Sequence, residues 1–136
     1  MASYTSMPAI SREKAEQLAK QNLLGIFGER GTTKRLAQMQ ATYDEEIEFY
    51  DPDKLVNGFD AINDFISQLL DNNPGWTFRP SGNVWVNCDL IMLAWEFGPA
   101  GQAAAVRGND VIFVSGEGKI KKMYTMIQGV SDTGKA

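Results

Sequence analysis

Three segments of the chain carry apolar residues at the spacing of an amphipathic helix. The first begins after Pro8, with Ser11 as a candidate N-cap, and closes at Gly28. The second follows Gly31, and the third covers Phe59 to about Leu70. The Asn-Asn-Pro-Gly run after the third segment cannot continue a helix. The pattern therefore predicts three helices in the N-terminal half of the chain.

Five other segments alternate between apolar and polar residues, as strands do when one face of a sheet is buried. One lies between the second and third helices, from Tyr43 to Asp51, and Pro52 ends it. The other four follow the third helix and cover Trp76 to Val86, with an interruption at Pro80 to Gly82, then Leu90 to Phe97, Ala103 to Ser115 and Lys119 to Gln128. We predict an α+β fold, a cone-like α+β barrel. In it, three N-terminal helices pack on a strongly curved antiparallel sheet of mixed strand order, and a cavity remains between them.

Composition and charge narrow the class of function. Of the 136 residues, 43% are hydrophobic and 22% charged, as in an ordinary globular protein. We expect one domain over 1–136, with a core of about residues 11–130 and flexible ends. A formal net charge of −4 argues against nucleic acid or an anionic membrane as a partner. The sequence has neither a signal-like start nor a long apolar run, so we expect a cytoplasmic protein.

The chain contains no histidine. This excludes Ser-His-Asp and Cys-His catalysis and the usual zinc sites. The lone cysteine, Cys88, permits no internal disulfide. Acid–base chemistry must come from carboxylates, Tyr, Lys or Cys, and we expect neither a metal nor an organic cofactor.

Asp110 stands out on the third strand of the C-terminal group. Alternation places it on one face with Val106, Gly108, Ile112 and Val114, which are otherwise apolar or small. An ionised carboxylate is costly to bury alone, so such a group either pairs or keeps its proton. A shift of the strand register by one residue would instead expose Asp110 to solvent.

Asp51 is the second candidate. It ends its strand beside Pro52, where it could accept a proton at the mouth of the same cavity. The alternative is a purely local role, since an aspartate in a turn commonly accepts backbone N–H bonds.

Several motifs resemble the nuclear transport factor 2-like superfamily, and within it the ketosteroid isomerases and SnoaL-like polyketide cyclases. They are Phe49-Tyr50-Asp51-Pro52, Gly58-Phe59-Asp60-Ala61-Ile62, Gly108-Asn109-Asp110-Val111 and Gly118-Lys119-Ile120. The resemblance covers roughly Glu13 to Gln128. It implies the fold more firmly than a reaction, because the superfamily contains isomerases, cyclases, dehydratases and non-enzymatic binders.

The resemblance also implies roles for particular residues. Asp51 matches the general base of ketosteroid isomerases, and Asp110 matches the protonated aspartic acid of their oxyanion hole. Phe27 takes the place of the tyrosine that completes that hole, so half of the hole would be missing.

By the same analogy, the inner face of two strands should supply the walls of a cavity for a small apolar ligand. With Phe27, the expected wall residues are Ile91, Leu93, Trp95, Met123, Thr125 and Ile127. The outer face should carry the interface of a homodimer, with Trp85, Met92, Tyr124 and Met126 in it.

Two functional hypotheses follow. The first is a cofactor-independent isomerase, cyclase or dehydratase that acts on an apolar, carbonyl-bearing ring compound, with Asp51 as base and Asp110 as acid or hydrogen-bond donor. The second is a ligand-binding or dimeric accessory protein on the same fold, without turnover. The substitution of phenylalanine for the family tyrosine favours the second hypothesis.

Overall fold

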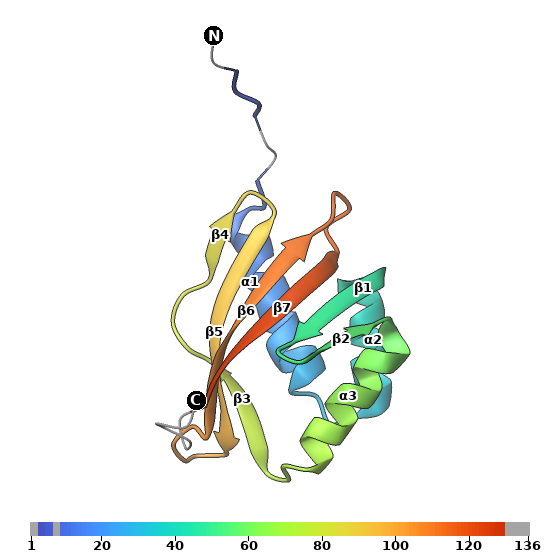
Figure 1. The fold of residues 1–136 in the computed structure, drawn as a ribbon, viewed down its shortest axis with the longest axis vertical. Coiled ribbons are helices and arrows are strands. Elements are labelled where there is room, and N and C mark those ends of the chain that lie inside the picture. The colour runs from blue at the N-terminus through green and yellow to red at the C-terminus, as the bar shows by residue number, and fades with distance from the viewer. Residues whose placement is uncertain (1–2, 7–8, 130–136) are drawn as a thin grey trace.

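Helices cover one side of a curved sheet in the computed structural model, which describes residues 3–6 and 9–129 (Figure 1). Helix α1 spans Arg12–Lys20 and continues as a π-helix, η1, over Gln21–Phe27. Helix α2 spans Thr32–Thr42, and α3 spans Phe59–Asp71. The predicted α+β class, with three helices on a curved sheet, is therefore confirmed. Among the described residues, no helix is both long and apolar enough to cross a membrane.

In the described part of the chain, seven strands form the sheet, in the order β2-β1-β7-β6-β5-β3, with β4 also paired to β5. Their bounds are β1 Tyr43–Asp51, β2 Lys54–Asn57, β3 Trp76–Pro80, β4 Trp85–Asn87, β5 Leu90–Pro99, β6 Val106–Val114 and β7 Ile120–Gly129. Strands β3 and β4 lie along the same edge of β5, one after the other. The predicted interruption between Trp76 and Val86 is thus confirmed.

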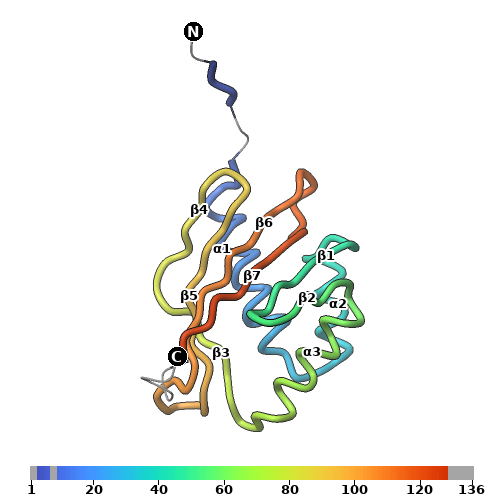
Figure 2. Tube along the Cα trace, in the orientation of Figure 1, coloured from blue at the N-terminus to red at the C-terminus, as the bar shows by residue number. Residues whose placement is uncertain are grey.

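Two features of the predicted sheet were wrong. The sheet is mixed, because β1 runs parallel to β7 while the other pairs are antiparallel. A parallel pair needs a long crossover, and here the crossover contains α3 and most of the sheet. The sheet also stays open, with β2 and β3 as its ends, instead of closing into a barrel (Figure 2). The alternation in the sequence reports which face of a strand is buried, but not which strand lies beside it.

The first predicted helix begins and ends as expected, but its winding differs. The Ser11 hydroxyl caps it by accepting from the Lys14 N–H at 3.1 Å. After Lys20 the helix widens, and the Gly28 N–H donates to the Leu23 carbonyl, five residues earlier, at 2.9 Å. Leu18 and Leu23 are also five residues apart and both are fully buried. The wider turn therefore keeps both side chains in the core and directs Leu23 and Phe27 toward the sheet.

Arg35 joins the helices at a point that the sequence pattern did not reveal. It is only 1% exposed, although arginine is rarely buried. Its Nε and Nη2 donate to the Glu29 carbonyl at 2.9 and 2.8 Å, and its Nη1 donates to Asn63 Oδ1 and Ser67 Oγ, each at 2.8 Å. The guanidinium thus connects α2 both to α3 and to the loop after η1.

Candidate active site

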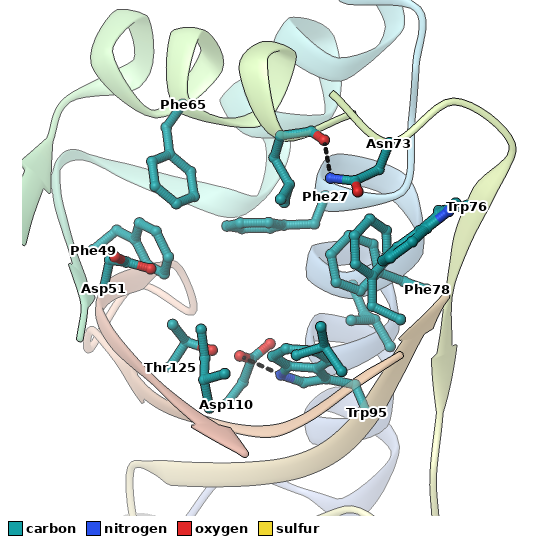
Figure 3. Close-up of a pocket in the computed structure, with 15 residues that line it drawn as sticks. Phe27, Phe49, Asp51, Phe65, Asn73, Trp76, Phe78, Trp95, Asp110 and Thr125 are labelled. Atoms are coloured by element: carbon teal, nitrogen blue, oxygen red, sulfur yellow. Dashed lines mark hydrogen bonds between the residues drawn. The ribbon is translucent and has the colours of Figure 1, made fainter. Parts of the chain in front are cut away.

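A cavity of about 350 Å³ lies between the helices and the concave side of the sheet. Most of its wall is apolar and aromatic, with four polar side chains facing it (Figure 3). These are Asp51, Asn73, Asp110 and Thr125. The remaining lining residues are Leu23, Phe27, Phe49, Phe65, Leu69, Trp76, Phe78, Trp95, Phe97, Val106 and Ile127. An apolar pocket with a few convergent polar groups is the usual form of a small-molecule site.

The structure divides the wall residues expected from the sequence into two groups. Phe27, Trp95, Thr125 and Ile127 line the cavity together with Asp51 and Asp110. The other expected wall residues do not line it and are fully buried in the core, namely Ile91, Leu93 and Met123. All of these strand residues are on the concave face. Two members of the core group, Ile91 and Leu93, lie on β5, against which α1 packs.

Asp110 is buried on β6 with 6% of its surface exposed, so the alternative register that would expose it does not occur. Its cross-strand partners are Leu93 on β5 and Thr125 on β7. The Trp95 indole N–H donates to Asp110 Oδ1 at 2.9 Å (Figure 3). The carboxyl group is thus held from the sheet side while it faces the cavity.

Burial raises the pKa of Asp110 to about 6, because the charged form is poorly solvated there. Hydrogen bonds from Trp95 and Thr125 act in the opposite direction, since both favour the carboxylate. Asp110 therefore changes charge near neutral pH, where a general acid or hydrogen-bond donor works best.

Gly108 makes the Trp95–Asp110 contact possible. It faces Trp95 across β5 and β6, and the indole ring lies over it. A Cβ atom at position 108 would lie 2.4 Å from Trp95 Cζ2 and 2.5 Å from the Met126 carbonyl oxygen. The indole ring therefore occupies the space that a side chain at position 108 would need.

Gly108→Ala is expected to destabilise the protein by about 1–3 kcal/mol, the usual cost of forcing extra volume into a packed core. The indole would also have to move, which would break its hydrogen bond to Asp110. Urea unfolding measures the first effect, and the tryptophan emission maximum reports the second. Gly116→Ala is the matched control, because a Cβ there meets no atom within 4 Å. Equal stability of the two variants would contradict the assigned role of Gly108.

Asp51 lies at the end of β1, half-buried, and lines the cavity from the side. Partial burial raises the pKa of Asp51, and a hydrogen bond with the side chain of Asp53 raises it further. The carboxyl group also accepts a backbone hydrogen bond from Asp53, which favours its charged form. Asp51 therefore takes part in the turn after β1 and also lines the cavity.

The titration of Asp110 should be visible in tryptophan fluorescence, because Trp95 donates directly to this carboxylate. We expect an emission change with a midpoint near pH 6, the pKa of Asp110. Asp110→Asn should remove the transition, since the amide has a similar shape but does not ionise. Trp95→Phe should remove it too, leaving only the signals of the other tryptophans. A transition that persisted in Asp110→Asn would assign it to another group.

The same group makes stability depend on pH with a defined sign. Between about pH 4 and pH 6 the folded chain keeps a proton on Asp110 that the unfolded chain has lost, so the free energy of unfolding falls as pH rises. Asp110→Asn has no carboxyl group at this position, so its free energy of unfolding should not show this decrease with pH. Its stability relative to the native protein should rise by about 2 kcal/mol between roughly pH 4.5 and 7.5, at about 1.4 kcal/mol per pKa unit.

No tyrosine lines the cavity within the described part of the chain. Phe27 lies on the helical side, with its ring edge-to-face against Phe49 and Phe78 at centroid distances of 5.3 and 6.2 Å. Tyr43 is buried, but its hydroxyl donates to Asn22 Oδ1 and not into the cavity. Thr125 lies beside Asp110, but the single proton of its hydroxyl is used in the hydrogen bond to that carboxylate.

Several wall residues were missed at the level of sequence. Phe65 and Leu69 lie in the third predicted helix, and its apolar spacing did not indicate which of its residues would face a cavity. Asn73 lies in the turn after α3, where asparagine is common for reasons of turn geometry alone. Over residues 3–6 and 9–129, no three His, Cys, Asp or Glu side chains are grouped closely enough to hold a metal ion.

Comparisons with known proteins agree with this architecture. Among solved structures, the chain is similar to a candidate isomerase of the SnoaL-like family from Agrobacterium tumefaciens, with a TM-score of 0.80 and 19% identity over 86% of this chain and 99% of the other. It is also similar to a candidate SnoaL-like polyketide cyclase from Jannaschia sp. CCS1, with a TM-score of 0.70 and 13% identity over 94% and 92% of the two chains. A candidate ketosteroid isomerase from Kribbella flavida aligns with a TM-score of 0.61 and 13% identity over 88% and 81%.

At these identities the solved structures establish the fold alone. No curated protein matches the sequence significantly. The family model of the NTF2-like domain, however, matches residues 10–127, which is most of the chain. The chain therefore belongs to the NTF2-like family.

Proposed function

We propose that the protein is a pocket enzyme that moves a proton within an apolar ring compound bearing a carbonyl group. The reaction would be of the isomerase, cyclase or dehydratase type. One observation carries the proposal: two carboxyl groups in different environments, Asp51 and Asp110, face the same apolar cavity. Pairs of acids whose surroundings separate their pKa values are suited to act as acid and base. Candidate isomerases and cyclases among the structural neighbours support the same class.

The difference in burial between the two acids supports a separate role for each. Asp110 is the more deeply buried acid, so it is suited to hold a proton and to donate a hydrogen bond to the substrate oxygen. A ring that fills the cavity would displace water beside Asp110 and raise its pKa further. Asp51, half-buried at the side, is suited to take a proton from the carbon next to the carbonyl group. The electron pair of that C–H bond then forms the enolate, and the proton on Asp51 returns to carbon.

Proton exchange in D₂O tests this chemistry without knowledge of the natural substrate. The protein is incubated with 1-tetralone, 2-tetralone and a steroid 3-ketone, and deuterium incorporation next to the carbonyl group is followed by mass spectrometry. We expect faster exchange than in buffer for at least one ketone that binds. Binding without any acceleration would contradict the enzymatic proposal.

A non-catalytic ligand-binding role is the second candidate, and the observation that favours it is Phe27. This residue lines the cavity but has no proton to donate, so Asp110 is left as the donor to a carbonyl group of the ligand. For a binder, ligand-induced increases in the melting temperature should survive both Asp51→Asn and Asp110→Asn.

We also propose that the outer face of the sheet joins two copies of the chain. Trp85 and Met126 are 64% and 58% exposed, and Met92 and Tyr124 are half-buried on the same face. Exposed apolar area of this kind usually marks an interface. Light scattering should give a dimer for the native protein and a monomer for Met126→Glu. A native protein that is monomeric at high concentration would contradict this proposal.

A further inference from the structure

One polar residue faces the cavity from the helical side. Asp110 and Thr125 project from the sheet, and Asp51 lies at the end of β1, whereas Asn73 follows the C-terminus of α3. Figure 3 places Asn73 across the cavity from Asp110, with aromatic rings between them. A ligand that spans the cavity would therefore meet a polar group at each end.

The orientation of the Asn73 amide is fixed by its neighbours. Its Nδ2 donates to the Leu69 carbonyl oxygen at 2.8 Å. A carbonyl oxygen can only accept, so reversing the amide would place two acceptors together. The Asn73 backbone is also held, because its N–H donates to the Leu70 carbonyl at 3.1 Å and its carbonyl accepts from Arg30 Nη2 at 2.9 Å. The side chain is thus a rigid element of the wall.

This arrangement leaves one polar atom of Asn73 for a ligand. Its Oδ1 has no hydrogen-bond partner within the described residues, and in Figure 3 it lies on the cavity side of the amide. An amide oxygen accepts hydrogen bonds and cannot donate them. An apolar ligand that covered this oxygen would remove its water and leave it unpaired, which is unfavourable. The complementary group is a hydrogen-bond donor.

We propose that the ligand of this cavity is a ring ketone that carries a hydroxyl group at the end opposite its carbonyl group, and that Asn73 Oδ1 accepts the hydrogen bond from that hydroxyl. The inference rests on the proposed function, because it takes the cavity as the ligand site and Asp110 as the partner of the carbonyl group. It assigns a specificity-determining role to Asn73. The aromatic walls select flat apolar rings, and Asn73 selects among them by a single donor.

Calorimetric titration with three matched probes tests the proposal. The probes are 1-tetralone, 6-hydroxy-1-tetralone and 6-methoxy-1-tetralone, of which only the second has a donor opposite the carbonyl group. The native protein should bind the hydroxy compound about three- to tenfold more tightly than the methoxy compound, the usual worth of one hydrogen bond. Asn73→Leu should bind the two compounds equally.

Asn72→Leu is the matched control, because it makes the same chemical change one residue away at an exposed position that does not line the cavity. It should keep the preference for the hydroxy compound. If Asn73→Leu fails to fold, Asn73→Ser takes its place. The comparison of the hydroxy and methoxy compounds on the native protein then still tests the inference.

Equal affinity of the native protein for the hydroxy and methoxy compounds would overturn the inference and leave the proposed function standing. A preference that survived in Asn73→Leu would also overturn it, since the hydroxyl would then bind elsewhere, for example at Asp110. If the native protein bound none of the ketones, both the inference and the proposed ligand class would fail.

Discussion

Replacing Arg35 by methionine is expected to lower the free energy of unfolding by roughly 3–5 kcal/mol, because three part-buried acceptors would lose their donor, at about 1–3 kcal/mol each. The acceptors are the Glu29 carbonyl, Asn63 Oδ1 and Ser67 Oγ. Methionine fills a similar volume, so the loss should come from these unpaired groups and not from a void. Urea unfolding followed by circular dichroism measures it.

Arg30→Met is the matched control for this variant. Arg30 also donates to three carbonyl oxygens, those of Leu70, Asn73 and Trp76, but its side chain is exposed. Water can replace its guanidinium at the surface, so we expect a loss of about 1 kcal/mol. A similar loss of stability in both variants would contradict the larger contribution expected from the buried Arg35.

The effect of Arg35→Met should extend to the cavity. Helix α3 supplies Phe65 and Leu69 to the wall, and η1 supplies Phe27. Arg35 links the segments that carry these side chains. Weaker binding of 1-tetralone by the folded variant would therefore be expected, even though Arg35 does not line the cavity.

Asp51→Asn is expected to slow enolisation by about 10²–10⁴-fold, the usual contribution of a positioned general base. Asparagine keeps the shape of the side chain and can still accept the backbone hydrogen bond of the turn, but it cannot take a proton. Ligand affinity should therefore change little, and the loss should appear in the exchange rate measured in D₂O. A variant that exchanged at the native rate would remove Asp51 from the mechanism.

Asp53→Asn is the matched control for the base. Asp53 lies two residues farther along the same turn, is exposed and does not line the cavity. Its hydrogen bond helps to raise the pKa of Asp51, so its removal should shift the acidic limb of the pH–rate profile to lower pH. The maximal rate should fall by less than about tenfold, because a weaker base remains in place. A loss as large as that of Asp51→Asn would indicate that the turn, not the base, had been disturbed.

The helices and strands followed closely from the pattern of the chain, for reasons that are local. Ser11 caps α1, Pro52 ends β1, and the Asn-Asn-Pro-Gly run ends α3, each by a property of a few neighbouring residues. The burial of Asp110 also followed from alternation, because the apolar residues on its side of β6 are buried in the core and fix the orientation of the strand. The short strand β2 was missed, since four mostly exposed residues leave no alternating pattern.

The candidate site depended more on packing. Alternation placed Ile91, Leu93 and Trp95 on one face, but only Trp95 lines the cavity, because the other two are buried in the core. Alternation placed Gly108 on the same face of its strand as Asp110, but nothing in the local sequence shows that its missing side chain makes room for the indole. Arg35 and Asn73 were likewise unremarkable until their distant partners were known.

The amino-acid sequence by itself predicted the order of the helices and of the strands other than β2, the concave and convex faces of the strands, and Asp51 and Asp110 as candidates for the concave side. These properties depend on the spacing of apolar residues and on turn chemistry, which act over a few residues. Only the tertiary structure decided the parallel pairing of β1 with β7, the donors that hold Asp110, and the free oxygen of Asn73 opposite it. Those features arise where segments far apart in the chain meet, and no short-range pattern records which segments will meet.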